Sequence, residues 1–248
     1  CRKAAMRLVE TDVKRVDITP KDLKELLGVP HYQDNSRSKQ DQIGVVNGLA
    51  WTEVGGELLE VEAGVMDGSG KLELTGNLGT VMQESVKAAY TCLRSRAAEL
   101  GIPRDFYKTE DIHVHFPEGA VPKDGPSAGI AIATAMLSAL TDRPVRHDVA
   151  MTGEITLRGR VLPIGGLKEK TMAAKRSGIR TVIIPKENEK DLEEIDQTVR
   201  AALRFVTAET VDAVFAHALA LPKKEAAVEH LAAMAGMDRQ EARCGDQL

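Results

Sequence analysis

The chain has 248 residues, and its 33 lysines and arginines against 37 aspartates and glutamates give a formal net charge of −4. This balance lacks the strongly basic field of a nucleic-acid-binding protein, and an aromatic content of 3% offers few surfaces for stacking bases. No apolar run reaches the roughly 18–20 residues of a membrane span. We therefore expect a soluble, cytoplasmic, globular protein that does not contact a membrane.

The three cysteines, Cys1, Cys92 and Cys244, form no CxxC pair. Their odd number favours free thiols in a reducing compartment over a disulfide framework or a zinc site, and we expect no metal centre. The chain starts at Cys1 inside a helical pattern and lacks the apolar centre of a signal peptide. These features are typical of a piece of a longer protein.

The first residues are expected to form a small helical segment. Thr19 is the expected N-cap of one helix, Pro20 its first residue, and Gly28 ends it. A polar stretch then predicts a linker. The expected organisation is a helical segment (1–30), a linker (31–42), a main domain (43–222) and a charged, alanine-rich, flexible tail (223–248).

The main domain opens with strand patterns. Two apolar runs flank Gly55 and Gly56, which predicts a hairpin or a short-looped strand pair with its turn at these glycines. Residues 71–76 alternate strictly between apolar and polar, which predicts a half-buried strand. The amphipathic helix that follows has apolar residues at helical spacing: Met82, Val86, Ala89, Leu93 and Leu100.

The remaining elements mix strands and helices without a regular βαβ rhythm, which predicts an α+β (mixed α/β) fold. A strand is predicted over 111–116, and a helix from about Ser127 to Leu140. The other predicted elements are two strand-like runs within 148–166, a helix over 166–178, a buried strand at 181–185, and helices at 187–195 and 210–219.

Ser127 follows Gly-Pro at the start of an apolar run. The segment GPSAG matches the G-x-S-x-G pattern of a nucleophile elbow, but the approach to it is polar and broken by two prolines, where that motif needs an apolar strand. A serine at a helix N-terminus also lies beside unpaired N–H groups that can hold an oxyanion. The alternative is an ordinary N-cap serine.

A nucleophilic serine needs a base, and histidine is the usual one. His113 and His115 share one face of a strand, a pattern that favours cross-strand packing over a metal pair because no third ligand is evident. An esterase of the α/β-hydrolase kind would need a downstream acid and histidine, and Asp148 with His217 is the nominal pair.

Lysine is the alternative base if burial keeps it neutral. On a helical wheel of about 100° per residue, Lys170 falls between Ala173 and Ala174, on the arc of small residues that should face the protein. Lys168 and Lys175 fall on another side. A lysine on the buried arc must be paired, or neutral and functional; the alternative is a stem that snorkels from the edge of the core.

Two segments carry a resemblance to a known family. PKDGPSAGI (122–130) and MTGEITLRGRVLPIGGLKEK (151–170) resemble the proteolytic domain of the bacterial Lon family of ATP-dependent proteases. The resemblance extends over about 43–220, and residues 1–30 are similar to the end of the small helical part of the preceding ATPase module. Three upstream segments are also similar to the family and occur in its order: 48–62, 74–85 and 111–120.

This resemblance implies a fold like the second domain of ribosomal protein S5, and it implies roles for five residues. Ser127 corresponds to the nucleophile and Lys170 to the general base. Thr152 corresponds to a threonine that orients the lysine. Asp124 and His115 correspond to positions that border the site, and Asp124 is also placed where it could pair with Lys170 and block it.

The resemblance further implies a Ser-Lys serine endopeptidase, the peptide-cleaving part of an ATP-dependent protease that degrades misfolded and regulatory proteins in quality control and stress response. Its substrates would be unfolded polypeptides and its assembly a homohexamer, with DNA contact implied by resemblance alone. The chain has no G-x-x-x-x-G-K-[ST] motif, so ATP and Mg²⁺ would act through a module outside it. A non-enzymatic binding module is the remaining alternative.

Overall fold

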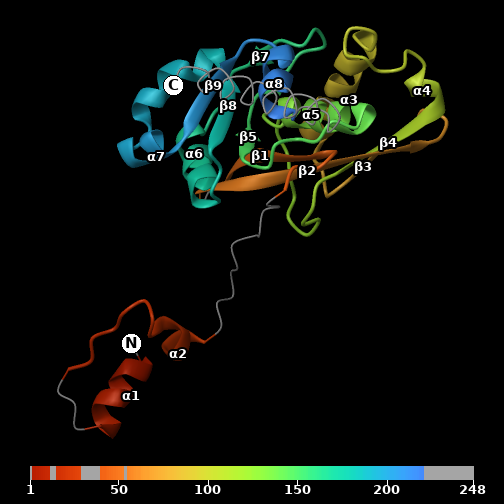
Figure 1. Ribbon diagram of the computed structural model, residues 1–248. Coiled ribbons are helices and arrows are strands. Elements are labelled where there is room, and N and C mark those ends of the chain that lie inside the picture. Colours follow the sequence, from red (N-terminus) through yellow and green to blue (C-terminus); the bar gives the residue numbers. More distant parts are fainter. Residues whose placement is uncertain (1, 12–14, 29–39, 53–54, 221–248) are drawn as a thin grey trace, which may run out of the picture. The chain divides into compact units, whose positions relative to one another are not determined.

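The computed structural model describes residues 2–11, 15–28, 40–52 and 55–220 (Figure 1). The chain divides into two compact units, residues 1–36 and residues 37–248. The expected tail at 223–248 and most of the expected linker lie outside the described residues, as do Cys1 and Cys244. Cys92 is described, and it is a buried free thiol.

The first unit contains two helices, α1 (Arg2–Glu10) and α2 (Leu23–Leu27), and neither has a buried residue. Helix α2 begins later than predicted. The Asp22 carboxylate accepts hydrogen bonds from the backbone N–H of Thr19 at 2.8 Å and from its hydroxyl at 2.6 Å, so Thr19 belongs to a turn before the helix and does not cap it. Gly28 ends the helix as predicted, with φ of 91°.

The second unit contains all the described strands. They are β1 (Val45–Thr52), β2 (Gly55–Asp67), β3 (Leu72–Thr75), β4 (Glu110–His115), β5 (Val149–Met151), β6 (Glu154–Ile155), β7 (Val161–Leu162), β8 (Thr181–Pro185) and β9 (Arg204–Ala208). Its helices are α3 (Thr80–Ser95), α4 (Phe106–Thr109), α5 (Gly129–Thr141), α6 (Leu167–Arg176), α7 (Gln197–Ala202) and α8 (Val211–Ala218), with a 3₁₀ helix, η1 (Lys186–Glu194).

Seven strands form one sheet in the order β3-β4-β2-β1-β5-β8-β9, and β6 with β7 forms a separate pair. Strand β2 is antiparallel to both β4 and β1, whereas β1, β5, β8 and β9 run parallel to one another. The predicted mixed α/β fold is confirmed. The sheet therefore changes from antiparallel to parallel pairing at β1, and at its other edge β3 pairs parallel with β4.

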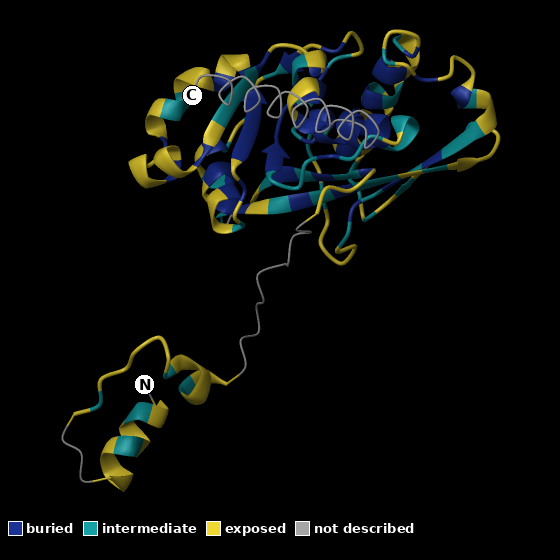
Figure 2. Cartoon of the chain, in the orientation of Figure 1, coloured by how far each residue is buried: buried dark blue, intermediate teal, exposed yellow. Residues whose placement is uncertain are grey.

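The sheet is covered differently along its width. In the parallel half, Met151 packs toward α3, α5 and α8, whereas its neighbour Ala150 packs toward α6 and α7. Both faces of this half are therefore buried, and β8 is accordingly buried at every residue and apolar after Thr181. Figure 2 shows the resulting buried centre of the sheet. In the antiparallel half, one face of β4 is buried through Ile112 and Val114 while the other is partly exposed.

Helix α3 has the predicted amphipathic pattern. Met82, Val86, Ala89 and Leu93 are buried on one side of it, but Leu100 lies beyond its last residue. The chain joins the second unit before residue 43, within the expected linker, because Gln42 forms a bridge with Val145. Across the described ranges, no helix combines the length and the apolar character needed to cross a membrane.

The predicted hairpin is confirmed, because β1 and β2 pair antiparallel starting from Thr52 and Gly55, but its turn does not lie at Gly55 and Gly56. Both glycines lie within β2, where they pair with Thr52 and Trp51 of β1. Gly56 is buried against the backbone of α6, at a position where a side chain would not fit. The glycine that suggested a turn is thus used for close packing between a strand and a helix.

Candidate active site

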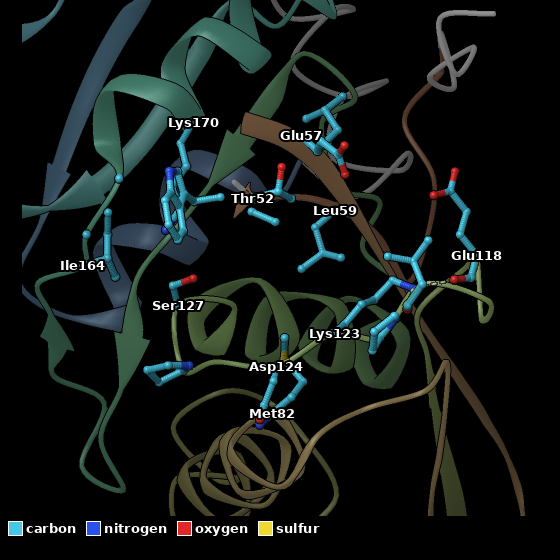
Figure 3. Close-up of a pocket in the computed structure, with 18 of the residues that line it drawn as sticks. Thr52, Glu57, Leu59, Met82, Glu118, Lys123, Asp124, Ser127, Ile164 and Lys170 are labelled. Carbon is cyan, nitrogen blue, oxygen red and sulfur yellow. Dashed lines mark hydrogen bonds between the residues drawn. The ribbon is translucent and has the colours of Figure 1, made fainter. Parts of the chain in front are cut away.

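A cavity of about 570 Å³ opens beside the end of β1. Only Asn47 and Gly48 of β1 pair with β5, so within the described chain Leu49–Thr52 has no strand partner on the side away from β2. The cavity contains the two principal candidates of the sequence, Ser127 and Lys170, and Figure 3 shows both side chains directed into it. Its apolar lining includes Trp51, Leu59, Met82, Val121 and Ile164.

Ser127 does not cap helix α5. The helix begins at Gly129 and its N-cap residue is Ala128, with no side-chain capping hydrogen bond. The N-cap alternative for Ser127 is therefore wrong, and its half-buried hydroxyl is presented to the cavity instead. Among the described residues, no group forms a hydrogen bond with this hydroxyl.

Gly153 holds the segment that carries Ser127. The N–H of Gly153 donates to the Ser127 carbonyl at 2.8 Å, and the Gly153 carbonyl accepts from the N–H of Ile130 at 3.1 Å. A Cβ on Gly153 would approach Val161 to 2.9 Å. Within the described chain, the backbone N–H groups of Ser127 and Ala128 donate to no protein acceptor, so both remain available to a negatively charged oxygen.

Lys170 lies in the first turn of α6 and is only 2% exposed. The wheel placed it correctly, because Ala173 and Ala174 are also buried whereas Lys168 and Lys175 are exposed. In the part of the chain that the structure describes, no carboxylate forms an ion pair with it. Burial lowers the pKa of Lys170 from 10.5 to about 8, because desolvation penalises the ammonium form. About a tenth of the lysine is then neutral at pH 7.

Thr152 connects the lysine to the serine segment. Its buried hydroxyl follows β5, accepts a hydrogen bond from Lys170 Nζ at 3.2 Å, and donates to the Ser127 carbonyl at 3.2 Å. Among the described contacts, no hydrogen bond joins Lys170 directly to Ser127. The threonine therefore fixes the lysine against the same peptide segment that presents the serine.

Asp124 lines the cavity but its carboxylate contacts the backbone and not Lys170. One of its oxygens accepts from the Met82 N–H and from the Gly125 N–H, each at 2.9 Å. Since Met82 lies in the first turn of α3, Asp124 satisfies a helix N–H that has no partner within the helix. The Asp124–Lys170 contact, which the sequence left open as a way to block the site, is absent among the described residues.

His115 lies away from the cavity lining. Its Nδ1 is 2.6 Å from the Thr75 hydroxyl, and Nε2 of His113 is 2.8 Å from the same oxygen. The two histidines thus meet across the strands through Thr75, as the packing alternative proposed. No three His, Cys, Asp or Glu side chains in the described ranges are placed to hold a metal ion.

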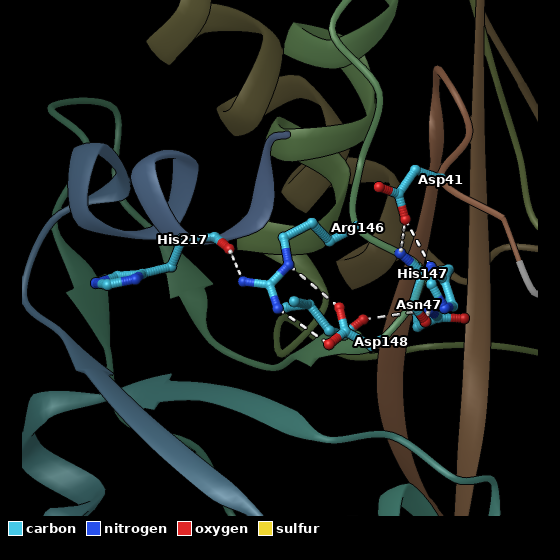
Figure 4. Close-up of polar contacts among 7 residues, drawn as sticks. Asp41, Asn47, Arg146, His147, Asp148 and His217 are labelled. Carbon is cyan, nitrogen blue, oxygen red and sulfur yellow. Dashed lines mark hydrogen bonds and ion pairs between the residues drawn. The ribbon is translucent and has the colours of Figure 1, made fainter. Parts of the chain in front are cut away.

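The nominal esterase pair is not assembled. Arg146 binds Asp148 through two nitrogens, at 3.0 and 3.2 Å, and a third nitrogen donates to the His217 carbonyl at 3.5 Å. Figure 4 shows the His217 ring directed away from Asp148. Neither residue lines the cavity that contains Ser127. In the same view, the Asp41 carboxylate binds the ring of His147 at 2.6 Å and attaches the start of the unit to the loop before β5.

Sequence reasoning missed two residues of the site. Trp51 lines the cavity with 57% of its surface exposed. As the only tryptophan of the chain, and in a composition poor in aromatics, it could have been noticed as a candidate binding residue. Gly153 gave no such signal, because its role depends on contacts between segments distant in the sequence.

A serine hydroxyl, a desolvated lysine without a charged partner and nearby free N–H groups are the components of a serine hydrolase that uses a lysine base. Comparison with known proteins agrees. The family of the Lon protease (S16) C-terminal proteolytic domain matches residues 17–221. The chain belongs to this family and is a peptidase domain.

The curated relatives are close in sequence. The chain is 58% identical over 219 residues to Lon protease of Brevibacillus choshinensis, and 54% identical over 224 residues to Lon protease 1 of Bacillus subtilis. These alignments cover 88% and 90% of this chain but only 28% and 29% of the relatives. The chain therefore spans less than a third of the length of these relatives.

Proposed function

We propose that the chain is a serine endopeptidase in which Ser127 and Lys170 form the catalytic dyad. The observation that carries the proposal is Lys170 itself, which is buried, has a pKa of about 8 and is connected through Thr152 to the segment that presents Ser127. A buried lysine that no carboxylate neutralises is costly unless its neutral form is used.

The reaction begins when neutral Lys170 accepts the proton of the Ser127 hydroxyl while Oγ attacks the carbonyl carbon of the scissile peptide bond. The backbone N–H groups of Ser127 and Ala128 donate to the resulting oxyanion. General-base assistance typically contributes about 10²–10⁴-fold and one oxyanion donor about 10²–10³-fold. Both contributions come from groups that the fold holds in place before substrate binds.

The second half reverses the direction of the proton. The Lys170 ammonium donates its proton to the leaving amine as the C–N bond breaks, which leaves an acyl-Ser127 ester. Neutral Lys170 then removes a proton from water as the water attacks the ester, and the acid product and free Ser127 are released. The Thr152 hydroxyl accepts from the ammonium and keeps it oriented toward the serine throughout.

The substrate is an extended polypeptide. The unpaired side of Leu49–Thr52 can accept a substrate strand, because main-chain hydrogen bonds are the usual means of adding a peptide to a sheet edge. The apolar lining around Trp51 and Val121 would receive substrate side chains. A folded protein cannot supply such a strand, so unfolded chains are the substrates that we propose.

The full-length protein is proposed to be an ATP-dependent protease that degrades misfolded and regulatory proteins in the cytoplasm, as part of quality control and the stress response. ATP with Mg²⁺ would act through a module outside residues 1–248. A homohexamer would enclose the sites, and contact with DNA rests on the resemblance alone. Support for these points is limited to membership in the family.

Cleavage of a fluorogenic peptide by single variants tests the dyad. Ser127→Ala and Lys170→Ala should each lower kcat at least 10³-fold, because each removes a group that the chemical step requires. A serine-directed covalent inhibitor should label the parent protein and not Ser127→Ala. Peptide cleavage that survives Ser127→Ala would refute the assignment of the nucleophile.

Lys168→Ala is the matched control for the base. Lys168 lies two residues away on the same helix, carries the same charge and is exposed. This variant should retain most of the activity. Thermal unfolding of all the variants should confirm that each is folded, and a reversed order of the two lysine variants would remove Lys170 from the proposal.

A further inference from the structure

Gly56 lies where β2 passes the helix that carries Lys170. It is buried and pairs with Trp51, and its φ is outside the left-handed region that favours glycine. A Cβ added there would lie 2.0 Å from the carbonyl oxygen of Glu169 and 2.9 Å from the backbone nitrogen of Lys170. Space, and not backbone conformation, therefore excludes a side chain at this position.

The atoms that Cβ would meet belong to the backbone of α6 and not to a flexible side chain. A methyl group at Gly56 must therefore displace either β2 or the first turn of α6. At Gly56, β2 pairs with β1, whereas its pairing with β4 begins only at Glu62. The variant described below tests which of the two elements moves. Displacement of the helix would carry Lys170 with it.

A second contact attaches α6 to the same residue. A guanidinium nitrogen of Arg176, six residues after Lys170 on α6, donates to the Gly56 carbonyl at 3.0 Å. At the start of the helix, Gly166 lies against Trp51, with its Cβ position 3.0 Å from the Trp51 side chain. The ends of β1 and β2 thus contact both ends of α6.

We propose that Gly56 is a positioning residue of the dyad, and that Arg176 holds α6 against it. The absence of a side chain at Gly56 sets how closely α6 approaches the sheet, and this distance sets the depth of Lys170 Nζ and its reach to Thr152. The inference rests on the proposed role of Lys170 as the base. It assigns no contact with substrate to Gly56 or Arg176.

Gly56→Ala tests the inference in the full chain. If α6 moves by about 1 Å, kcat for peptide cleavage should fall about 100-fold, with KM changed less than twofold. The acid limb of the pH profile should also move to higher pH, because a less buried lysine has a pKa nearer to 10.5. A purely structural loss of folded protein would lower the amount of active enzyme without moving this limb.

Gly64→Ala is the matched control. It makes the same substitution in the same strand, at an exposed glycine with ordinary φ and no heavy atom within 4 Å of the added Cβ. Its kcat and pH profile should equal those of the parent. An equal loss in both variants would show that the strand, and not the approach to α6, is responsible, and would overturn the proposal.

A direct titration separates this inference from the proposed function. NMR of the chain with isotope-labelled lysine, with the Lys170 signal assigned from Lys170→Arg, reports the pKa of Lys170 whether or not it is catalytic. Gly56→Ala should raise that pKa, and Gly64→Ala should not. If Lys170→Ala keeps full activity, the dyad fails while the titration still decides whether Gly56 positions the lysine.

Arg176 provides the second test, which also decides the matter if Gly56→Ala does not fold. Arg176→Ala should raise the Lys170 pKa and lower kcat about tenfold, since one of the two attachments is lost. Arg176→Lys retains a donor and should recover part of both. If Gly56→Ala folds, an unchanged Lys170 pKa and an unchanged kcat in this variant would overturn the proposal. If it does not fold, the same result in Arg176→Ala would overturn it.

Discussion

Lys170 is the residue at which stability and chemistry oppose each other. It is 2% exposed, its ammonium donates to the Thr152 hydroxyl, and burial holds its pKa at about 8. An isolated buried charge is unfavourable, so the fold is less stable with this side chain than with an apolar one. The same desolvation produces the neutral amine that a general base requires.

The pH dependence of peptide cleavage should follow the pKa of Lys170. Since only the neutral lysine accepts the serine proton, kcat/KM should fall about tenfold per pH unit below an apparent pKa of about 8. Initial rates from pH 5.5 to 9.5 at constant ionic strength measure this. An acid limb near the ordinary histidine pKa, about 6.5, would point to a different base.

Lys170→Met should stabilise the protein at neutral pH. The folded-state pKa of about 8 lies below the unfolded value of 10.5, so the unfolded chain binds more protons between these values and the parent gains stability as pH rises through that window. Below pH 8 the cost of the buried charge is present in full. We expect the variant to be more stable at pH 7 by on the order of 1–3 kcal/mol.

Urea unfolding of parent and variant at pH 7 and pH 10 measures this difference. Burial also raises the pKa values of Tyr90 and Cys92, but their contributions are common to both proteins and cancel in the comparison. The stability difference should shrink at pH 10. A parent more stable than Lys170→Met at pH 7 would show that the lysine has a stabilising partner.

Individual elements show which features the local sequence pattern could predict and which it could not. The helical wheel for α6 identified Lys170 because the spacing of small and apolar residues within the helix itself shows which side is buried. The turn was placed wrongly at Gly55 and Gly56 because a glycine is needed at position 56 for close contact with Glu169, more than a hundred residues away in the chain. Capping of α5 was the alternative role for Ser127, and the sequence around this serine could not show that Ala128 would be the N-cap residue.

The N-terminus of α3 is fixed by a residue from another segment. Asp124 accepts the Met82 N–H, and a Cβ on Gly79 would approach the Asp124 side chain to 2.3 Å, so the helix start and the segment before Ser127 are closely packed. No local pattern around Gly79 predicts a cap that comes from more than 40 residues away. This contact joins a structural helix to the segment that presents the nucleophile.

Asp124→Ala should therefore destabilise the protein by about 1 kcal/mol, the usual cost of losing a helix cap. Asp124→Asn keeps an acceptor and should lose less. Urea unfolding measures the stability, and amide exchange at Met82 should accelerate in Asp124→Ala alone. Equal exchange at Met82 in the parent and in Asp124→Ala would show that this hydrogen bond does not protect the helix start.

At the scale of the whole chain, the two units differ in the apolar side chains that they bury. The described helices of residues 1–36 have no buried residue, whereas residues 37–248 contain the two apolar cores. The succession of predicted strands and helices indicated a mixed fold but not the order of the strands in the sheet. That order depends on pairings between distant segments, such as Asn47 with Ala150.

Removal of residues 1–36 should leave the second unit folded. Because the first unit contributes no buried side chain among its described helices, the unfolding midpoint of the shortened chain should lie within about 2 °C of the parent, a shift that corresponds to no more than about 1 kcal/mol in a chain of this size. Calorimetry of both chains measures this. A midpoint lower by 5 °C or more would show that the first unit supports the second.

The short pairing between β1 and β5 has a consequence for what the protein can recognise. On the side of β1 away from β2, the four residues Leu49–Thr52 have no strand partner among the described residues, a length of about 13 Å at the rise of a strand. Recognition through backbone groups depends little on side-chain identity. It does require that the substrate chain be extended and that its backbone N–H groups be free to donate hydrogen bonds. Such a protease would discriminate by physical state, accepting many sequences once they are unfolded and disfavouring proline where an N–H is needed.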